Sequence, residues 1–237
     1  ETLKAQNFTS ATASYNTAVG FHAGNDVTTG IDNTLIGGFA GDAITTANSS
    51  VAVGKYALSG TTTGGANTAI GLQALYSNTT ATLNTAVGYQ SLVANTTGAS
   101  NTAVGGLALD ANTTASNNTA VGYSSLGANT TGTANVAVGK ATLEAATTAD
   151  GNTAVGYASQ DNTTTGANNT ALGRHSMDGN TTGADNVGVG AYALAGNTTA
   201  SNNTAIGKSA LYANTTGTRN TALGGAALDA NTTGSEL

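Results

Sequence analysis

The sequence contains no proline, cysteine or tryptophan, and only 8% of its 237 residues are charged. Without cysteine, neither a disulfide framework nor a thiolate metal site can form, and the redox compartment cannot be inferred. Six basic and twelve acidic residues give a net charge of −6. This balance argues against binding to nucleic acid or to anionic membranes, because both require clustered lysine and arginine.

No apolar run approaches the roughly 20 residues that span a bilayer. The chain shows no signal peptide and begins with Glu1 rather than methionine, so we expect a mature product or a piece of a longer protein. The richness in Gly, Ala, Ser, Thr and Asn is also found in disordered chains. Disorder is disfavoured here because an aliphatic residue recurs at every seventeenth position.

A 17-residue unit repeats thirteen times without insertion or deletion. We number its columns 1 to 17 from the unit at 101–117, NTAVGGLALDANTTASN. Column 1 is Asn in twelve of thirteen repeats, column 4 is always Val, Ile or Leu, column 5 is always Gly, and columns 13 and 14 are Thr-Thr. A fixed short period means that each unit stacks on its neighbours, so the chain is a solenoid.

The unit predicts an all-β fold, a parallel β-solenoid (β-roll) of thirteen 17-residue coils with two short strands per coil. A helix is disfavoured by the repeated glycine and the Asn-Thr-Thr runs. At about 4.8 Å per coil, thirteen coils form a rod of about 60 Å. We expect residues 1–15 to be a degenerate first coil, a cap or a joint, and residues 16–237 to be a single solenoid domain.

Alternation along the strand places columns 2 and 4 on one face. Valine replaces threonine in column 2 at Val51, Val136 and Val187, which predicts that this face points inward. Columns 3 and 5 then form an outer face of Ala and Gly, where a second chain could approach closely. Column 9, which is Leu in nine repeats, is a second inward anchor. Because no C-terminal cap is visible, either the chain continues or rods stack end to end.

The unit NTAVGYQSLVANTTGAS resembles the head repeats of trimeric autotransporter adhesins, which carry a Ser/Asn-x-Ala-Val/Ile-Gly strand followed by a small-residue turn. It is equally similar to phage tail-fibre repeats with NTAVGY and NTTG blocks. The resemblance covers Asn16 to Glu236. It implies a parallel β-roll, left-handed in the adhesin heads, assembled as an extracellular homotrimer on a cell or virion surface. Adhesin-head units are a few residues shorter, so the turn is longer here.

Columns 6, 7 and 10 carry nearly all of the sequence variety. They hold the candidate attachment or packing edge: Tyr56, Tyr89, Tyr123, Tyr157, Tyr192, Lys140, Arg174 and Lys208. A receptor or glycan surface and an inter-chain seam are both consistent with these residues. Acidic residues gather in column 10, at Asp42, Asp110, Glu144, Asp161, Asp178 and Asp229. They could bind calcium, but a solvated edge is favoured, and no metal or cofactor is predicted.

Catalysis is disfavoured, because the two histidines, His22 and His175, are nine coils apart and no cysteine is present. The Thr-Thr columns form a threonine ladder, for example at Thr96, Thr97, Thr113, Thr114, Thr130 and Thr131. Such ladders on β-solenoids can bind ice, although adjacent threonines point to opposite faces, so at most one per coil faces outward. The repeated Asn-Thr-Thr sites would carry glycans in a secreted eukaryotic chain, and are turn asparagines in a bacterial or phage protein.

The sequence therefore predicts a structural protein of an extracellular or virion surface fibre, either an adhesin head or a tail-fibre shaft. It would form a rigid rod that presents a variable edge for attachment, with end-to-end filaments as a variant. The expected partners are copies of itself, as a homotrimer or a filament, and a host-surface receptor or glycan, without nucleic acid or membrane insertion. The alternative is an ice-binding solenoid that uses the threonine ladder.

Overall fold

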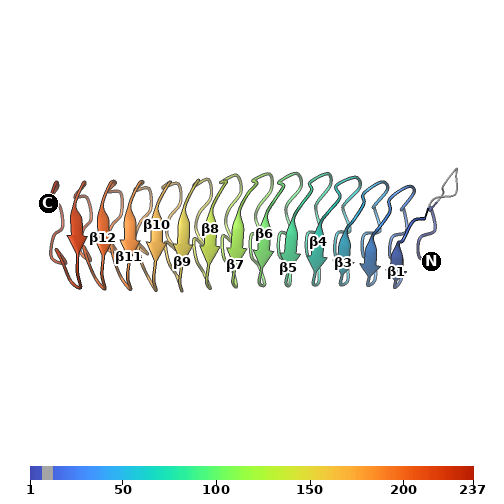
Figure 1. Cartoon of the computed structure of the whole chain (residues 1–237), viewed down its shortest axis with the longest axis horizontal. Helices are drawn as coiled ribbons and strands as arrows, with labels where there is room; N and C mark the ends of the chain where they lie inside the picture. Colours follow the sequence, from blue (N-terminus) through green and yellow to red (C-terminus); the bar gives the residue numbers. More distant parts are fainter. Residues whose placement is uncertain (7–12) are drawn as a thin grey trace. The chain divides into compact units, whose positions relative to one another are not determined.

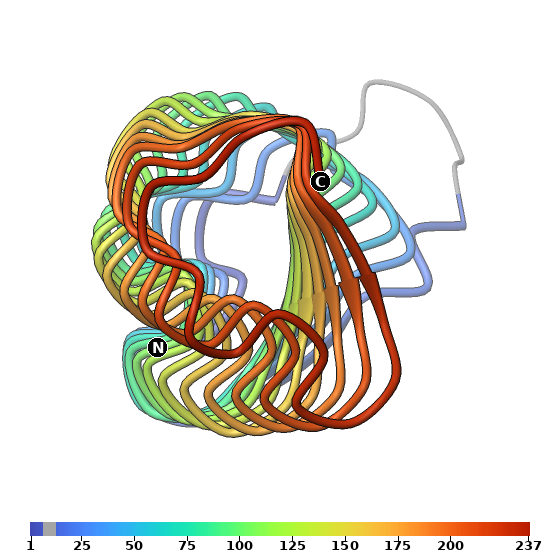
Figure 2. The ribbon, with the colours of Figure 1, turned by 90° about the vertical axis from the view of Figure 1, so that its left-hand side faces the viewer.

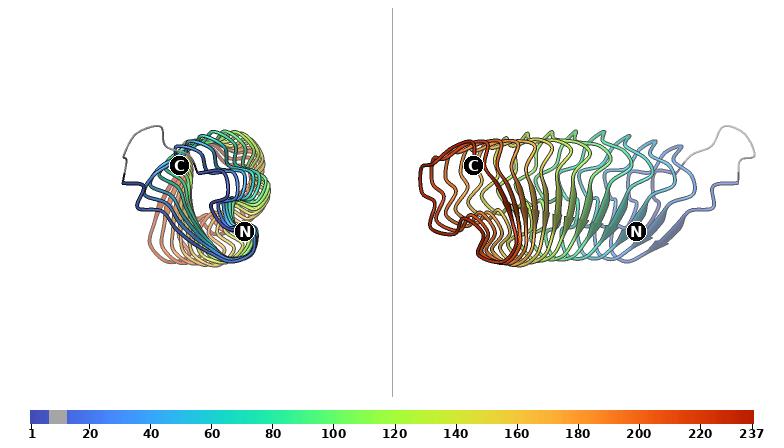
Figure 3. Two further views of the ribbon diagram at one scale, coloured as in Figure 1. Left: turned by 90° about the vertical axis from the view of Figure 1, so that its right-hand side faces the viewer. Right: turned by 60° about the vertical axis from the view of Figure 1, so that its left-hand side comes forward.

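The computed structural model describes residues 1–6 and 13–237, and the chain divides into two compact units, residues 1–117 and 118–237. Each unit is a stack of 17-residue coils that follow one another in sequence order (Figures 1 and 3). Unit 1 contains coils 1 to 6 and unit 2 contains coils 7 to 13, counted by their strands.

Each coil contains one strand of three residues, in columns 2 to 4. The strands of unit 1 are β1 (Thr17–Val19), β2 (Thr34–Ile36), β3 (Val51–Val53), β4 (Thr68–Ile70), β5 (Thr85–Val87) and β6 (Thr102–Val104). The strands of unit 2 are β7 (Thr119–Val121), β8 (Val136–Val138), β9 (Thr153–Val155), β10 (Thr170–Leu172), β11 (Val187–Val189), β12 (Thr204–Ile206) and β13 (Thr221–Leu223).

Within each unit, a strand pairs in parallel with the strand of the next coil, column against column. In unit 1, Thr85 of β5 pairs with Thr102 of β6, and the same shift of one unit relates the strands of unit 2. In the view along the stack, the strand forms one side of each coil (Figure 2). This register confirms the predicted all-β parallel solenoid, while its left-handed sense stays an expectation from the resemblance.

The second strand predicted for each coil is wrong, since no coil has more than one strand over the described residues. Columns 6 to 12 instead form consecutive turns. In coil 5, the backbone N–H of Asn95 donates to the carbonyl of Leu92 at 3.2 Å. Gln90 and Leu92, in columns 7 and 9, have φ angles of 52°. Tight turns of this kind need a left-handed residue, which an extended strand cannot contain.

Column 5 is always glycine because the neighbouring coil lies too close for a side chain. Gly88 has a φ of 138°, and a Cβ atom placed on it would lie 2.5 Å from the carbonyl oxygen of Gly105 in the next coil. Both the backbone angle and the available space therefore exclude other residues.

The two faces of the strand are the reverse of those predicted. The column-3 residues Ala52, Ala69 and Ala86 are fully buried, whereas Ile70 and Val104 of column 4 are 39% and 37% exposed. The prediction followed the hydrophobicity of valine, but the interior volume decides the outcome. A short coil is already filled by other columns, so only a methyl group fits inside at column 3.

Column 9 points inward, as predicted. Its side chains are fully buried in ten coils: Leu58, Leu75, Leu92, Leu109, Leu126, Leu143, Gln160, Met177, Leu194 and Leu211. In unit 2, Met177, Leu194 and Leu211 pack with the column-3 and column-8 alanines into one core cluster. The core is therefore a thin row of leucines between two rows of alanines.

The sizes of columns 3 and 9 compensate each other. Leu35 replaces alanine in column 3, and a Cβ atom placed on Gly24 or Gly41 of column 9 would lie 2.7 or 2.8 Å from its methyl groups. Conversely, Gly188 replaces alanine where column 9 holds the longer Met177, whose Cγ would lie 3.1 Å from a Cβ at position 188. Each coil thus keeps a nearly constant core volume, as close packing requires.

Buried asparagines in columns 1 and 12 tie successive coils together. Asn186 accepts the backbone N–H of Asn203 at 3.0 Å and donates its amide to the carbonyl of Ala200 at 2.8 Å. In column 12, Asn197 donates to the amide oxygen of Asn180 and to the same Ala200 carbonyl, both at 3.0 Å. These amides satisfy backbone groups that the turns leave without partners inside the coil.

The first residues also bond to coil 1. The N–H of Leu3 donates to the carbonyl of Ala23 at 3.2 Å, and that of Ala5 to the carbonyl of Asn25 at 3.1 Å. The segment predicted as a degenerate first coil, cap or joint is 1–15, and its residues 7–12 lie outside the described residues. That assignment, and a single domain over 16–237, stay predictions.

Candidate functional site

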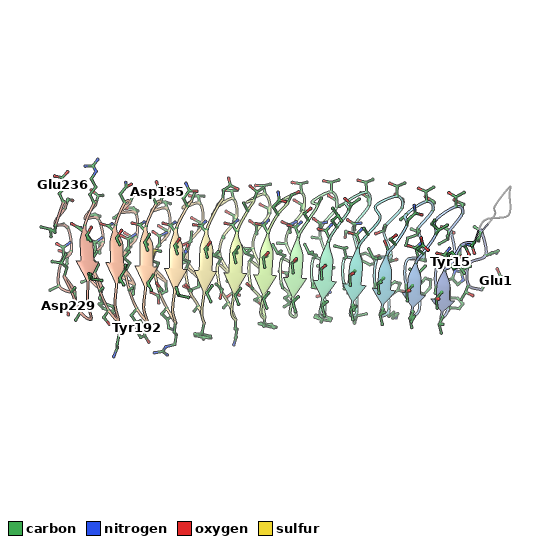
Figure 4. The ribbon with its side chains drawn as sticks, in the orientation of Figure 1. Glu1, Tyr15, Asp185, Tyr192, Asp229 and Glu236 are labelled. Atoms are coloured by element: carbon green, nitrogen blue, oxygen red, sulfur yellow. The ribbon has the colours of Figure 1, made fainter. Side chains whose placement is uncertain are left out.

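The candidate edge formed by columns 6, 7 and 10 lies on the surface of both units. Tyr89, Tyr123 and Tyr157 are 52%, 54% and 48% exposed, and the side chains of the basic members Lys140, Arg174 and Lys208 are exposed as well. Tyr56 and Tyr192 are half-buried. In unit 2, Tyr192 and Asp229 lie on the side of the stack opposite to Asp185 and Glu236 (Figure 4).

In unit 1 the edge contains a continuous row of ring contacts. Phe21 and His22 lie 4.2 Å apart between ring centroids, and His22 stacks on Phe39 at 5.5 Å. Phe39 stacks on Tyr56 at 5.1 Å, and Tyr56 meets Tyr76 edge to face at 6.1 Å. The Nζ atom of Lys55 lies 5.0 Å from the centre of the Tyr56 ring.

Unit 2 contains a second row, with more polar groups. His175 meets Tyr157 edge to face at 5.3 Å and stacks on Tyr192 at 5.4 Å, with the two planes 7° apart. Tyr192 meets Tyr212 at 6.5 Å. Arg174 lies 4.9 Å above the Tyr192 ring and donates to the Tyr192 hydroxyl. We call Tyr157, Arg174, His175, Asp178, Tyr192 and Tyr212 the unit 2 cluster.

Two carboxylates in adjacent coils lie beside this cluster. Burial, and then the charge of Asp178, raises the pKa of Asp161 above its ordinary 3.8. Burial also raises the pKa of Asp178, although His175 opposes the shift, with its Nδ1 3.1 Å from an Asp178 carboxylate oxygen. These carboxylates are incompletely hydrated, so they remain able to accept hydrogen bonds from a ligand.

Sequence reasoning identified the tyrosines and Arg174 but missed His175 and Asp178 as parts of one cluster. His175 is in column 7, and it contacts Tyr157 from column 6 of the preceding coil. The signal was present, because a residue in column 7 lies next to column 6 of the neighbouring coil once the coils stack. Within residues 1–6 and 13–237, no group of three or more His, Cys, Asp or Glu side chains could hold a metal ion.

The threonine ladder divides into an inner and an outer column. The hydroxyl of Thr96, in column 13, donates to the backbone carbonyl of Thr113 in the next coil at 3.0 Å. Thr130 of the same column bonds the carbonyl of Thr147 at 3.1 Å in unit 2. The column-14 residues are exposed, among them Thr97, Thr114 and Thr131. One threonine per coil therefore faces solvent fully, as predicted.

The asparagines of the Asn-Thr-Thr sites point into the coil. Asn78, Asn95, Asn180, Asn197 and Asn214 are fully buried. Their amide nitrogens donate within the ladder, for example from Asn214 to Asn197 at 3.1 Å. A glycan on such a nitrogen is incompatible with this fold.

The outer face of the strands is a second surface, and sequence reasoning placed it inside. It carries the threonines and valines of column 2 and the aliphatic residues of column 4, and no position of either column is charged. Exposure reaches 47% at Leu172 and 40% at Ile206. In each unit this face is a continuous, uncharged strip of half-exposed aliphatic side chains, which is unusual for a surface without a partner.

No pocket is found in the described part of the chain, and that part contains no helix long and apolar enough to cross a membrane. Comparison of the chain with protein-family models, with curated proteins and with solved structures gives no match. Function is therefore inferred from the chain's own surfaces.

Proposed function

We propose that this protein is a structural component of an extracellular or virion surface fibre, an adhesin head or a tail-fibre shaft, with no catalytic role. The observation that carries the proposal is the division of labour between columns. Columns 1, 3, 5, 9, 13 and 14 are nearly uniform and hold one coil on the next, whereas variety is confined to columns 6, 7 and 10 at one edge. A repetitive scaffold with one variable edge suits a rigid spacer that presents contact residues.

The outer face of the strands would join copies of the chain. Face-to-face packing of sheets buries alternate side chains of each strand, and here these are uncharged Thr, Val, Ile and Leu. A single thin core supports 17 ordered residues per coil only weakly, so burying this strip would stabilise each coil further. Together with the resemblance to trimeric adhesin heads, this favours a homotrimer around the strand faces rather than around an Ala/Gly face.

Charge placed on this face tests the assembly. In unit 2, Val138→Asp with Val155→Asp puts two carboxylates on the strand face of adjacent coils, and Thr148→Asp with Thr165→Asp puts two on the exposed column 14 of the same coils. Sedimentation velocity should show a trimer for the wild type and the column-14 variant, and a monomer for the strand-face variant. A monomeric wild type at high concentration, or equal dissociation of both variants, would contradict the proposed interface.

Ice binding is the second candidate, and the exposed column 14 favours it. This column is threonine in all thirteen coils, so each unit presents hydroxyl and methyl groups at the coil spacing of about 4.8 Å. A thermal-hysteresis assay, with Thr97→Lys and Thr114→Lys as the disruptive variant, tests it. Absence of ice shaping by the folded wild type removes this candidate.

A further inference from the structure

The unit 2 cluster is held in place without a ligand. His175 lies between Tyr157 and Tyr192, with Asp178 within 3.1 Å of its Nδ1. Arg174 is fixed over the Tyr192 ring by its hydrogen bond to the hydroxyl. Side chains that are already ordered lose little conformational entropy on binding, which is a property of binding sites rather than of a solvated edge.

The row offers two open ring surfaces and a polar middle. Tyr157 and Tyr212, at its two ends, are 48% and 49% exposed. Tyr192 has one ring face towards His175 and the other groups of its surroundings include Arg174, so its hydroxyl and edge rather than an open ring face are available. The ends are separated by three coils, about 14 Å along the stack at about 4.8 Å per coil. This length suits an oligosaccharide or a polymer rather than one sugar.

The polar groups indicate a neutral, hydroxyl-rich ligand. Arg174 donates hydrogen bonds, and Asp161 and Asp178 accept them, so both roles that a sugar hydroxyl needs are present. The opposite charges nearly balance, which disfavours a polyanion such as nucleic acid or an acidic polysaccharide. Aromatic rings pack against the C–H faces of pyranose rings, and the absence of a pocket in the described chain suits an extended polymer lying on the surface.

We propose that the unit 2 cluster binds a neutral saccharide chain that lies along the stack of coils from Tyr157 to Tyr212. The inference rests on the attachment role proposed above and names its ligand class. The row of unit 1 is the natural comparison, because its central position, Phe39, lacks the imidazole and carboxylate pair of His175 and Asp178.

Native affinity electrophoresis provides the test, in gels containing a soluble neutral glucan, mannan or galactan, an acidic alginate, or single-stranded DNA. We expect at least one neutral polysaccharide to retard the wild type. Tyr157→Ala with Tyr212→Ala should weaken that binding by about tenfold or more, as loss of aromatic anchors does. Phe21→Ala with Tyr76→Ala, the matched change at the ends of the unit 1 row, should leave it unchanged.

Thermal melting verifies that each variant is folded, and Arg174→Gln provides a second, milder change that should also weaken binding. The inference is overturned if no neutral polysaccharide retards the wild type, if only alginate or DNA does, or if the unit 1 variant loses as much affinity. Oligomeric state is measured separately. A trimer that binds no polysaccharide removes this inference alone, whereas a monomer that binds one removes the proposed assembly alone.

Discussion

Leu35 and Gly41 share the core space that an alanine and a leucine share in most other coils. Leu35 is fully buried, and a Cβ atom placed on Gly41 would lie 2.8 Å from its Cδ2 atom. Column 3 and column 9 thus face each other across the interior, and the sequence compensates a large residue on one side with a small one on the other.

A double-mutant cycle should reveal this coupling. Leu35→Ala opens a cavity and should cost about 2–5 kcal/mol, and Gly41→Leu overpacks the coil and should cost about 1–3 kcal/mol. Because the double variant restores the usual Ala and Leu pair, we expect it to be more stable than the sum of the two changes, although Ile44 still crowds position 41. Urea unfolding measures all four proteins, and strictly additive effects would show that the two residues do not share this space.

Gln160 is a fully buried column-9 residue whose amide oxygen and nitrogen both lack a hydrogen-bond partner. Gln160→Leu, which restores the usual residue, should stabilise the protein by about 1–3 kcal/mol, because an unsatisfied buried amide is costly. The reverse change in the preceding coil, Leu143→Gln, should destabilise it by a comparable amount. A Gln160→Leu protein that unfolds at lower urea than the wild type would mean that the amide has a partner.

The buried asparagine ladder makes a third prediction. Asn186→Ala removes the acceptor of the Asn203 N–H and the donor to the Ala200 carbonyl, and should cost about 2–4 kcal/mol. Thr199→Ala, at an exposed position of the same coil, should change stability by less than about 0.5 kcal/mol. Similar melting temperatures for the two variants would rule out a structural role for the ladder.

The partly buried carboxylates predict a pH dependence. The pKa of Asp161 is raised above 3.8 in the folded protein, so its charged form opposes folding at neutral pH. Asp161→Asn should therefore be the more stable protein at pH 7. As pH falls through the raised pKa, the wild type becomes protonated and regains this stability, and below 3.8 the difference should vanish. Melting temperatures from pH 7 to pH 3 measure it, with Asp229→Asn, exposed in the same column, as the control.

The period, the parallel stacking and the inward column 9 could all be predicted from sequence, because a fixed 17-residue repeat leaves no other way to bury the leucines. The faces of the strand could not. Alternation places Thr85 and Val87 on one side and Ala86 on the other, but it does not say which side is inside. The size of the interior decides this, and the size depends on how the leucine and asparagine columns pack.

The turns and the unit 2 cluster show the same limit. Left-handed angles at Gln90 and Leu92 replace a predicted strand, although neither residue type favours that conformation. Likewise, His175 and Tyr192 are 17 residues apart in sequence and meet only because columns stack. Such contacts follow from the exact path of the coil, which composition and spacing do not determine.

The central claim, a fibre built from chains joined by their strand faces, is tested most directly by electron microscopy of the purified protein at a resolution that counts chains in cross-section. The account predicts three chains, with columns 2 and 4 at the centre and the edge of columns 6, 7 and 10 on the outside. Particles one chain wide, or chains joined through the variable edge, would contradict it.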